Sequence, residues 1–134
     1  MSVNDRIRES FGKQALMRTF GAELASVVPG SVSIRAPIRE FALQQQGLAH
    51  AGLTFALGDS AAGYSALSVM PEGFEVVTSE IKINLLAPAL GDYLTATGKV
   101  IKPGKRLVIV TSEVHRDDGT LVAILQGTMV PVPL

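Results

Sequence analysis

The sequence predicts an α+β fold in which one antiparallel sheet packs against a single long, buried helix. The helix is indicated by residues 50–67, a segment of small and apolar residues with one acid and few β-branched side chains. Four strand-like runs follow, and the loops between them are too short for the crossover that parallel strands need. A sheet and a helix that bury a face on each other form a two-layer α+β domain.

The composition favours a single domain, residues 1–134, and limits the kinds of partner. With 47% hydrophobic residues, the chain is able to build a sizeable core. Its 12 basic and 12 acidic residues balance, and no basic stripe marks a face for nucleic acid. The chain has no cysteine and 2 histidines, which excludes cysteine-ligated zinc and argues against a histidine-rich metal site. We therefore expect no metal and no nucleic acid.

Residues 41–58 carry no Asp, Glu, Lys or Arg, which raises the question of a membrane span. The segment contains glutamines, glycines and His50, and Asp59 follows it directly. Each polar group costs free energy in hydrocarbon, so we reject a span. The N-terminus shows no apolar stretch of signal-peptide length. A soluble, cytoplasmic protein is the expectation.

A short helix and a hairpin are expected before the long helix. Asn4 is a suitable cap for a helix over residues 5–11. Residues 19–28 and 31–38 have the composition of two strands, and Pro29-Gly30 between them is a turn signal.

A polar loop over residues 44–50 leads into the long helix, whose side chains form two apolar faces at helical spacing. One of these faces holds Asp59. A helix that is apolar nearly all round is buried on most sides. Gly58 and Gly63 each cost such a helix about 1 kcal/mol relative to Ala. We therefore expect another backbone to pack closely at these positions.

Four strands are expected after the helix, at residues 77–85, 93–101, 107–116 and 121–130. Their short connections predict a meander in which each strand pairs with the next. Alternation along the first of them predicts two faces, one with Val77, Ser79, Ile81, Ile83 and Leu85 and the other with Thr78, Glu80, Lys82 and Asn84. The result is a curved antiparallel sheet of five to six strands wrapped around one central helix.

Asp59 raises the question of why a charge lies in an apolar helix. An unpaired, buried carboxylate is costly, so it must be paired, hydrogen-bonded or protonated. One interpretation is a core acid satisfied by backbone groups or by a Lys or Arg from a strand. The other is a general base or nucleophile whose reactivity is raised by desolvation. No cation lies near Asp59 in the sequence, which favours the functional interpretation.

The start of the helix is a second candidate site. The first N–H groups of a helix lack internal partners and lie at the positive end of its dipole. Ala51 and Gly52 have small or absent side chains, so a thioester or ester oxygen is able to approach these N–H groups, as in an oxyanion hole. The alternative is an ordinary glycine-rich helix entry. For His50, a structural role as a helix cap or loop partner is favoured over direct chemistry.

Ala51 and Asp59 are eight residues apart, which corresponds to about 12 Å along a helix axis. One helix therefore does not place both groups on the same carbonyl carbon. If the two groups cooperate, an antiparallel second copy of the helix supplies the other half, and a two-fold dimer has two equal sites. Gly58 and Gly63 fit close packing of the helix beside such a symmetry mate.

The residues around the helix start resemble the signature of PaaI-type hotdog acyl-CoA thioesterases: Gln44-x-x-Gly47-x-x-His50-Ala51-Gly52, then Asp59 nine residues after the histidine. Residues 78–89 resemble the strand and Pro-Ala turn that follow in the family, and residues 100–106 resemble its later basic turn. The resemblance implies a hotdog fold and hydrolysis of a small or medium acyl-CoA, aromatic acyl groups included, to free acid and CoA. It also implies no cofactor beyond the CoA of the substrate, and a homodimer with shared sites, often within a homotetramer.

The resemblance also implies roles for individual residues. Asp59 is the implied catalytic carboxylate, as nucleophile or as base for water. Gln44 stands where Asn or Gln binds the carbonyl or positions water. The N–H groups of Ala51 and Gly52 hold the thioester oxygen, and a backbone N–H survives the departure from the family's Gly-Gly pair at Ala51. Thr78 falls where some members carry a Ser or Thr that assists the acid or the water.

His50 belongs to the same motif and completes the candidate catalytic group. Lys102, Lys105 and Arg106 lie in the turn where basic side chains of the family commonly meet CoA phosphates, and a solvated turn is the alternative. Two other functions stay open. One is a non-catalytic hotdog module that binds acyl-CoA, and the other is a hotdog enoyl-CoA hydratase or dehydratase built on His50 and Asp59.

Overall fold

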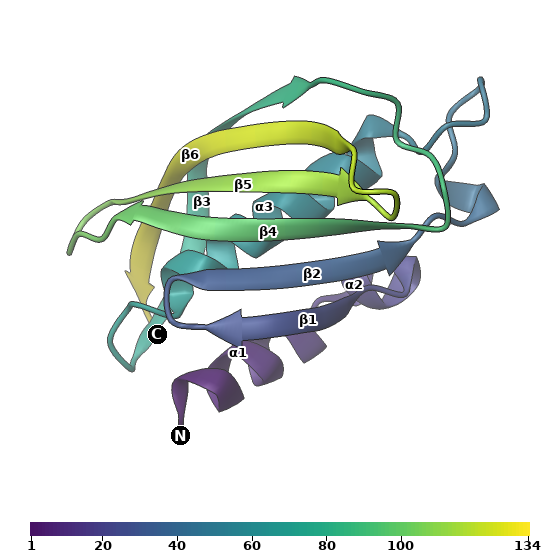
Figure 1. The fold of residues 1–134 in the computed structure, drawn as a ribbon. Coiled ribbons are helices and arrows are strands. Elements are labelled where there is room, and N and C mark those ends of the chain that lie inside the picture. Colours follow the sequence, from purple (N-terminus) through teal and green to yellow (C-terminus); the bar gives the residue numbers. More distant parts are fainter.

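The computed structural model describes residues 1–134 as a curved sheet wrapped around one long helix (Figure 1). In chain order the elements are α1 (Val3–Gly12), α2 (Ala15–Phe20), β1 (Glu23–Val28), β2 (Ser31–Pro37), the 3-10 helix η1 (Glu40–Ala42), α3 (Ala51–Leu67), β3 (Phe74–Leu85), β4 (Tyr93–Lys102), β5 (Val108–Arg116) and β6 (Leu121–Pro133). All six strands pair antiparallel in a single sheet, and α1 lies beside the β1 edge. The α+β hotdog fold expected from the sequence is confirmed.

The first helix begins earlier than expected. Ser2, rather than Asn4, caps α1, because the Ser2 Oγ accepts a hydrogen bond of 3.0 Å from the Asp5 N–H. Asn4 lies within the helix, and its Oδ1 accepts a hydrogen bond from Arg8. Ser and Asn are comparable caps, so sequence alone does not decide between positions two residues apart.

A second short helix, α2, was not expected and takes residues assigned above to the first strand. Gly21 ends α2 in the left-handed region with a φ of 71°, a conformation that glycine adopts without strain. The strand predicted to begin at Thr19 therefore begins at Glu23. Its pairing with β2 confirms the predicted hairpin.

The strand order in the sheet is β1-β2-β4-β5-β6-β3. The pairings of β4 with β5 and of β5 with β6 agree with the meander, but the expected pairing of β3 with β4 is wrong. β3 instead pairs with β6 along its whole length and forms the second edge of the sheet. The connection between β3 and β4, residues 86–92, is long enough to pass over the end of the β5–β6 hairpin.

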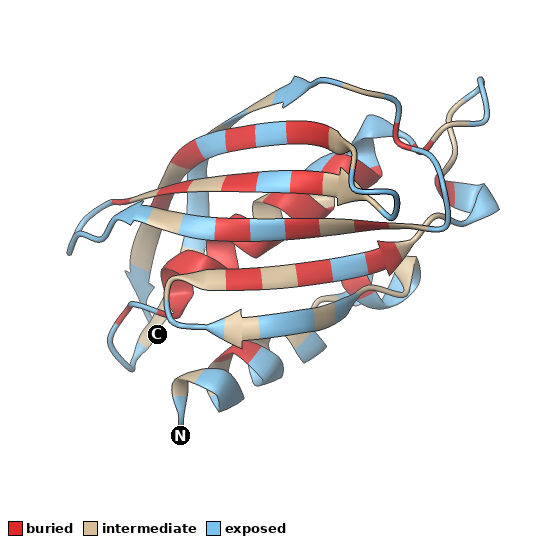
Figure 2. Ribbon diagram, viewed as in Figure 1, coloured by how far each residue is buried: buried red, intermediate tan, exposed pale blue.

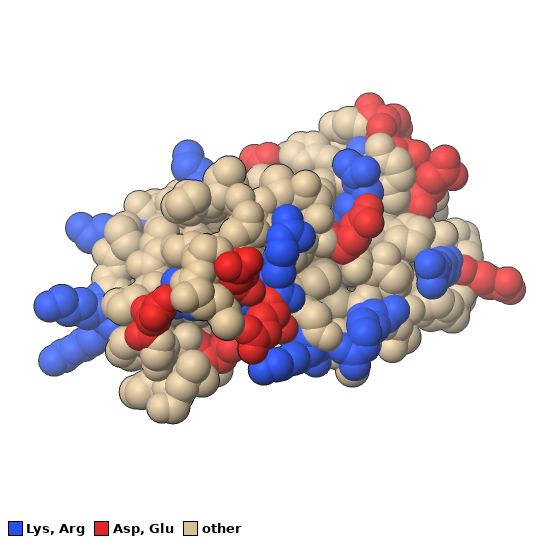
Figure 3. Space-filling view, turned by 90° about the horizontal axis from the view of Figure 1, so that it is seen from below, with Lys and Arg blue, Asp and Glu red and all other residues tan.

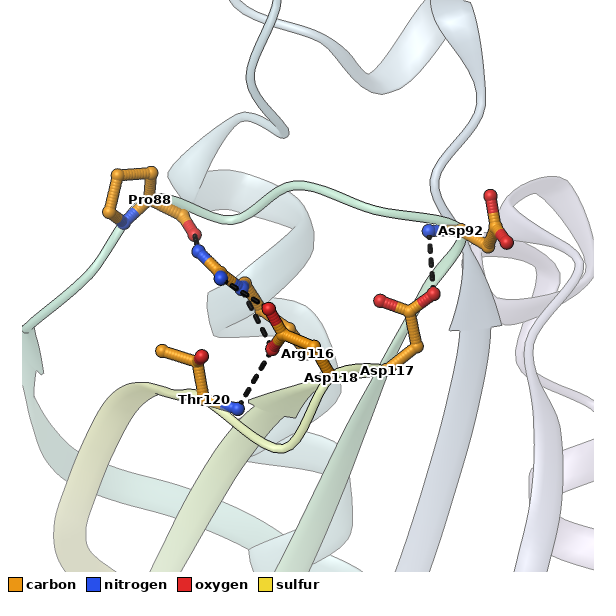
Figure 4. Close-up of polar contacts among 6 residues, drawn as sticks. All are labelled: Pro88, Asp92, Arg116, Asp117, Asp118 and Thr120. Carbon is orange, nitrogen blue, oxygen red and sulfur yellow. Dashed lines mark hydrogen bonds and ion pairs between the residues drawn. The ribbon is translucent and has the colours of Figure 1, made fainter.

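Polar contacts hold this crossover segment, residues 86–92, against the β5–β6 turn (Figure 4). Arg116 donates hydrogen bonds to the Pro88 carbonyl, at 3.3 Å, and to the Asp118 carboxylate. Asp117 accepts from the Asp92 N–H at 3.2 Å. The hydrogen bond from Arg116 also holds the pKa of Asp118 well below its usual value. Hydrogen bonds therefore hold the crossover segment near both of its ends.

The central helix α3 forms the middle of the hydrophobic core, and its second half is buried on all sides (Figure 2). A Cβ added at Gly58 would lie 2.7 Å from Leu125 Cδ1, and the Ser112 Oγ donates to the Gly58 carbonyl at 2.9 Å. Gly58 therefore serves packing against the molecule's own sheet, which corrects its assignment to a symmetry mate. At Gly63 the nearest atoms would be 4.0 Å away, so no close approach requires this glycine. No helix is both long and apolar enough to cross a membrane.

A β-bulge in β3 changes which of its side chains face α3. The pairing with β6 shifts register between Thr78 and Glu80, so Ser79 is an extra residue. The Thr78 hydroxyl points inward as a result, while Val77 is 49% exposed on the outside. Ile81 packs against the core, as expected. The predicted alternation is correct after the bulge and wrong before it.

Candidate functional site

Asp59 lies in the middle of α3 and is half-buried. The Thr78 hydroxyl donates a hydrogen bond of 2.7 Å to the Asp59 Oδ1. No Lys, Arg or His nitrogen lies within 4 Å of the Asp59 carboxylate, so it has no ion-pair partner in the chain. Burial raises the pKa of Asp59 above its ordinary value, and the hydrogen bond from Thr78 partly offsets this rise. The carboxylate is therefore desolvated but oriented.

Asp59 lines a cavity of about 350 Å³, and most of the other residues that line it are polar. Thr78 and Ser60 line it beside Asp59, and α1 and the loop after it contribute Ser10, Lys13 and Gln14. Local sequence patterns do not reveal these N-terminal residues, because they reach the cavity through contacts with α3 that are more than 40 residues apart in the chain.

A small hydrogen-bond network closes the cavity on the side of α1. The Tyr64 hydroxyl accepts a hydrogen bond from the Gln14 Nε2 at 3.0 Å and lies 3.1 Å from the Ser10 Oγ. The Ser60 hydroxyl donates to the Gln14 Oε1 at 3.4 Å. Burial raises the pKa of Tyr64, so its hydroxyl keeps its proton at neutral pH. These contacts hold the cavity-lining residues next to α1 in place.

His50 is the N-cap of α3, and its side chain changes the expected oxyanion hole. The His50 Nδ1 accepts a hydrogen bond of 2.7 Å from the Gly52 N–H. The Gly52 N–H is therefore satisfied within the chain, which corrects the expectation that it is free to hold a carbonyl oxygen. The Ala51 N–H has no acceptor in the chain. Of the two predicted donors, only Ala51 is available.

Gln44 lies in the loop before α3, and its side chain organises that loop. The Gln44 Oε1 accepts hydrogen bonds from the N–H groups of Gln46 and Leu48, and its Nε2 donates to the Gln46 side chain. Gln44, His50 and Ala51 line a second cavity, of about 340 Å³, at the start of α3. Neither Asp59 nor Thr78 lines this cavity.

The structure thus brings the predicted site residues together in two separate groups. Gln44, His50 and Ala51 surround the helix start, and Asp59 and Thr78 lie further along the helix. This separation agrees with the distance of about 12 Å that eight helical residues span. A single chain does not assemble the whole predicted site.

One face of α3 is open to solvent over its first half, and we call it the open face of α3. Its residues are Ala51, Gly52, Phe55, Ala56, Asp59 and Ser60. Phe55 is 37% exposed, the largest apolar side chain on this face. β3, an edge strand, lies next to the open face, as the contact between Asp59 and Thr78 shows.

The basic residues predicted to meet CoA lie elsewhere. Lys102 ends β4, and Lys105 and Arg106 lie in the β4–β5 turn, all three exposed. None of them lines the Asp59 cavity or the helix-start cavity. No group of three or more His, Asp and Glu side chains is arranged to hold a metal ion.

Comparison with known proteins agrees with this geometry. The family model of the thioesterase superfamily matches residues 46–123, which include both candidate groups apart from Gln44. The crystal structure of a thioesterase family protein from Silicibacter pomeroyi superposes with a TM-score of 0.94 at 34% identity, covering 99% of this chain and 100% of its own. The 1,4-dihydroxy-2-naphthoyl-CoA hydrolase of Listeria monocytogenes is 27% identical over 85% of this chain and 93% of its own.

The PaaI protein of E. coli, from the phenylacetic acid degradation operon, has the same fold. Its structure gives a TM-score of 0.90 at 24% identity and covers 97% of this chain and 93% of its own. The family model covers more than half of the 134 residues, and the Silicibacter protein matches nearly all of them. The chain therefore belongs to the thioesterase superfamily, with the hotdog fold that PaaI also has.

Proposed function

We propose that this protein is an acyl-CoA thioesterase that hydrolyses a small or medium acyl-CoA to free acid and CoA. The observation that carries the proposal is the Asp59 carboxylate, which is desolvated, free of any cation and oriented by Thr78. A structural acid would be expected to pair with a cation or to accept several backbone hydrogen bonds. An unpaired carboxylate at the mouth of a cavity is instead suited to attack or proton abstraction.

The proposed reaction uses the two groups of residues for two different tasks. The Ala51 N–H at the positive end of α3 donates to the thioester oxygen and stabilises the negative charge that develops there. Asp59 either attacks the carbonyl carbon or takes a proton from the attacking water. If Asp59 attacks, the C–S bond breaks to leave a mixed anhydride between the acyl group and Asp59, which water then hydrolyses to the free acid and the regenerated carboxylate. If Asp59 acts as a base, the attacking water becomes part of the acid directly as the C–S bond breaks. In both cases the thiolate of CoA leaves and is protonated.

Supporting roles follow from the observed contacts. Thr78 holds the Asp59 carboxylate in one orientation and, by donating a hydrogen bond, favours its ionised form. His50 fixes the start of α3 as its cap, and Gln44 shapes the loop that borders Ala51. Gln44 also keeps the proposed task of binding the carbonyl or positioning water, since it lines the same cavity as Ala51.

The separation of Ala51 and Asp59 is the reason to propose a homodimer with shared sites. Two α3 helices that pack antiparallel through their open faces bring the Ala51 of one chain to the Asp59 of the other, and two-fold symmetry makes two such sites. The β3 edge supports this arrangement. It is 12 residues long, and an edge of that length has unpaired backbone groups that favour pairing with another strand. A pair of such dimers would give the homotetramer expected from the sequence.

CoA enters the proposal as part of the substrate. Lys102, Lys105 and Arg106 are exposed and make no ion pair or hydrogen bond within the chain, so they are free to bind phosphate groups. No further cofactor or metal is proposed.

The test is a panel of acyl-CoA thioesters, with detection of the free thiol as each is hydrolysed. Turnover of at least one thioester is expected, and its absence across the panel would favour the module that only binds acyl-CoA. The hydratase alternative is less consistent with the structure, because the Nδ1 of His50 already accepts the Gly52 N–H. Enoyl-CoA and hydroxyacyl-CoA are included in the panel to test that alternative directly.

A further inference from the structure

Gly63 lies in the buried half of α3, and the packing of the chain does not account for it. Glycine in the interior of a helix lowers the stability of the helix relative to alanine. A position usually needs glycine because its φ is positive or because another group comes too close for a Cβ. Gly63 does not have a positive φ, and the atoms nearest to an added Cβ, Met129 Sδ and Val76 Cγ1, would be 4.0 Å away. An alanine would therefore fit at this position and would stabilise the helix.

A second copy of the chain does not account for Gly63 either. The proposed dimer packs α3 through its open face, whereas Gly63 is buried inside its own chain. Gly58 shows the contrast, because a Cβ there would lie 2.7 Å from Leu125 Cδ1 and the sheet therefore requires this glycine. Gly63 has no such structural reason.

What distinguishes Gly63 is its place in the Asp59 cavity. It lines this cavity together with Asp59 of α3 and with Val76 and Thr78 of β3. Asp59 and Gly63 are four residues apart, so they lie one above the other on the same side of the helix. A side chain at Gly63 would extend toward the sheet, because its nearest neighbours are Val76 of β3 and Met129 of β6. The missing side chain therefore leaves space between α3 and β3, one turn beyond the carboxylate.

The charges around the cavity favour an uncharged occupant of this space. A carboxylate on the occupant would meet Asp59 and Glu75, and the one cation of the lining, Lys13, already pairs with Glu9 at 3.6 Å. α1, which borders the cavity, lies at the bottom of Figure 1, and on the face seen from below acidic and basic side chains lie next to one another (Figure 3). Size rather than charge is therefore the property on which this cavity is able to select.

The distance between Asp59 and Gly63 shows which part of a substrate would use the space. Four helical residues span about 6 Å along the axis. An extended chain advances roughly 1.2 Å per bond, because three backbone bonds span at most about 3.6 Å. An acyl chain that is held at Asp59 by its carbonyl carbon and runs along α3 therefore reaches Gly63 after about five bonds, near its sixth carbon. An acetyl group ends well short of this position.

We propose that Gly63 determines which acyl groups the protein accepts, by leaving room for groups that extend about one helical turn beyond Asp59. This inference rests on the proposed function, because it takes the Asp59 cavity as the site of the acyl group. The preferred substrates are uncharged acyl-CoA thioesters of about hexanoyl length, and acetyl-CoA is a poor substrate. Gly63 contacts the acyl group and takes no part in breaking the thioester bond.

The experiment fills the space at Gly63 and compares two substrates, hexanoyl-CoA and acetyl-CoA. Gly63→Ala adds one methyl group and Gly63→Leu adds a branched side chain, and both new residues are good helix formers. Gly12→Ala and Gly12→Leu are the matched controls, because Gly12 is a helical glycine with room for a Cβ that does not line the Asp59 cavity. The measured quantity is the ratio of kcat/KM for hexanoyl-CoA to kcat/KM for acetyl-CoA.

This ratio should fall about threefold in Gly63→Ala and at least about tenfold in Gly63→Leu. A hydrophobic pocket discriminates about tenfold or more per methylene, and we expect less per carbon from the mostly polar lining of this cavity. The kcat/KM for acetyl-CoA, and both constants of the Gly12 variants, should stay within about twofold of the wild type.

Three results would overturn the role of Gly63: a wild type that prefers acetyl-CoA, an unchanged ratio in the Gly63 variants, or an equal loss for both substrates. If Gly63→Leu does not fold, Gly63→Ala decides alone, because it is expected to be more stable than the wild type.

A binding measurement separates this inference from the proposed function. Isothermal titration of Asp59→Asn with each thioester gives two dissociation constants, which are then measured again with Gly63→Ala or Gly63→Leu added. Hexanoyl-CoA should bind to Asp59→Asn more tightly than acetyl-CoA, and the replacements at Gly63 should reduce this difference. The result is independent of turnover, so it judges Gly63 even if the wild type hydrolyses neither thioester. Equal binding of the two thioesters, no binding, or a difference that the Gly63 variants keep contradicts the proposal.

Discussion

The Thr78 hydroxyl donates a hydrogen bond of 2.7 Å to the Asp59 carboxylate, and a β-bulge makes this contact possible. In a regular strand Thr78 and Glu80, two residues apart, would face the same way, away from the helix; the bulge at Ser79 places them on opposite faces. The bulge therefore joins the middle of α3 to the edge strand β3 at one carboxylate. Bulges commonly re-aim a side chain next to a functional site, which agrees with the task proposed for Asp59.

Replacement of Asp59 by Asn should abolish most of the thioesterase activity and leave the fold intact. Asn keeps the size of the side chain but is neither a base nor a nucleophile, so we expect a loss of roughly 10²- to 10⁴-fold in kcat. Thiol release measured on the best substrate of the panel checks this. Wild-type turnover by Asp59→Asn would show that Asp59 is a structural acid.

The Asp59→Asn variant also tests the effect of this carboxyl group on stability. Burial raises the pKa of Asp59 in the folded state. The protonated carboxyl therefore makes its full contribution to stability below the unfolded pKa, and this contribution is lost as the pH rises through the folded pKa. Ionised Asp59 is therefore a cost at neutral pH, and Asp59→Asn should be at least as stable as the wild type at pH 7. Urea unfolding at pH 7 and near pH 3 checks this, and the difference should shrink at the lower pH.

Thr78→Val should move the acid limb of the pH–rate profile to higher pH. The hydrogen bond from Thr78 lowers the pKa of Asp59, so its removal raises that pKa further and requires a higher pH for the ionised form. The measurement is kcat/KM as a function of pH for the wild type, Thr78→Val and Thr78→Ser. Thr78→Ser keeps a hydroxyl and should retain the wild-type limb, and an unshifted limb in Thr78→Val would be inconsistent with this role.

Much of the fold could be predicted because it depends on local patterns. The long helix over residues 50–67, the hairpin around Pro29-Gly30 and the β4–β5–β6 pairings follow from composition, turn residues and short loops. The position of β3 could not be predicted in this way. Its place at the sheet edge depends on how far the sheet curls around α3, and loop length does not encode this curvature.

The candidate site likewise has a part that could be predicted from the sequence and a part that could not. Asp59 and the helix start are visible in the sequence because a lone acid and small residues stand out in an apolar segment. The inward orientation of Thr78 depends on a bulge, which alternation along the strand does not reveal. The occupied N–H of Gly52 depends on the rotamer of His50, and the contacts of Gln14 with Tyr64 and Ser60 depend on the packing of α1.

A pair of glycine substitutions tests the packing of α3 on the sheet. A Cβ at Gly98 of β4 would overlap the Ala61 carbonyl of α3, a backbone atom that is not free to move away. We expect Gly98→Ala to lower the free energy of unfolding by about 1–3 kcal/mol, the usual cost of overpacking. Gly63→Ala is the control, because the nearest atoms to a Cβ at this position would be 4.0 Å away. It should raise the free energy of unfolding by up to about 1 kcal/mol. Chemical denaturation measures both, and equal effects would contradict the close helix–strand contact.

Mixing two inactive chains tests the shared site most directly. Ala51→Pro removes only the N–H of Ala51, because proline is favoured at the first helical position and His50 already has the extended conformation, with φ −61° and ψ 143°, that precedes a proline. Ala51→Pro should fold, and lose roughly 10²- to 10³-fold in kcat as an oxyanion donor is lost. Ala51→Gly keeps the N–H and should stay active.

When Ala51→Pro chains are refolded with an equal amount of Asp59→Ala chains, half of the random dimers contain one chain of each kind. In those dimers one of the two sites combines an intact Ala51 N–H from one chain with an intact Asp59 from the other, so about a quarter of the wild-type activity should return. Thiol release by the mixture, compared with each variant refolded alone, measures this recovery. A mixture no more active than its components would place both groups of each site on one chain, which the distance along α3 argues against.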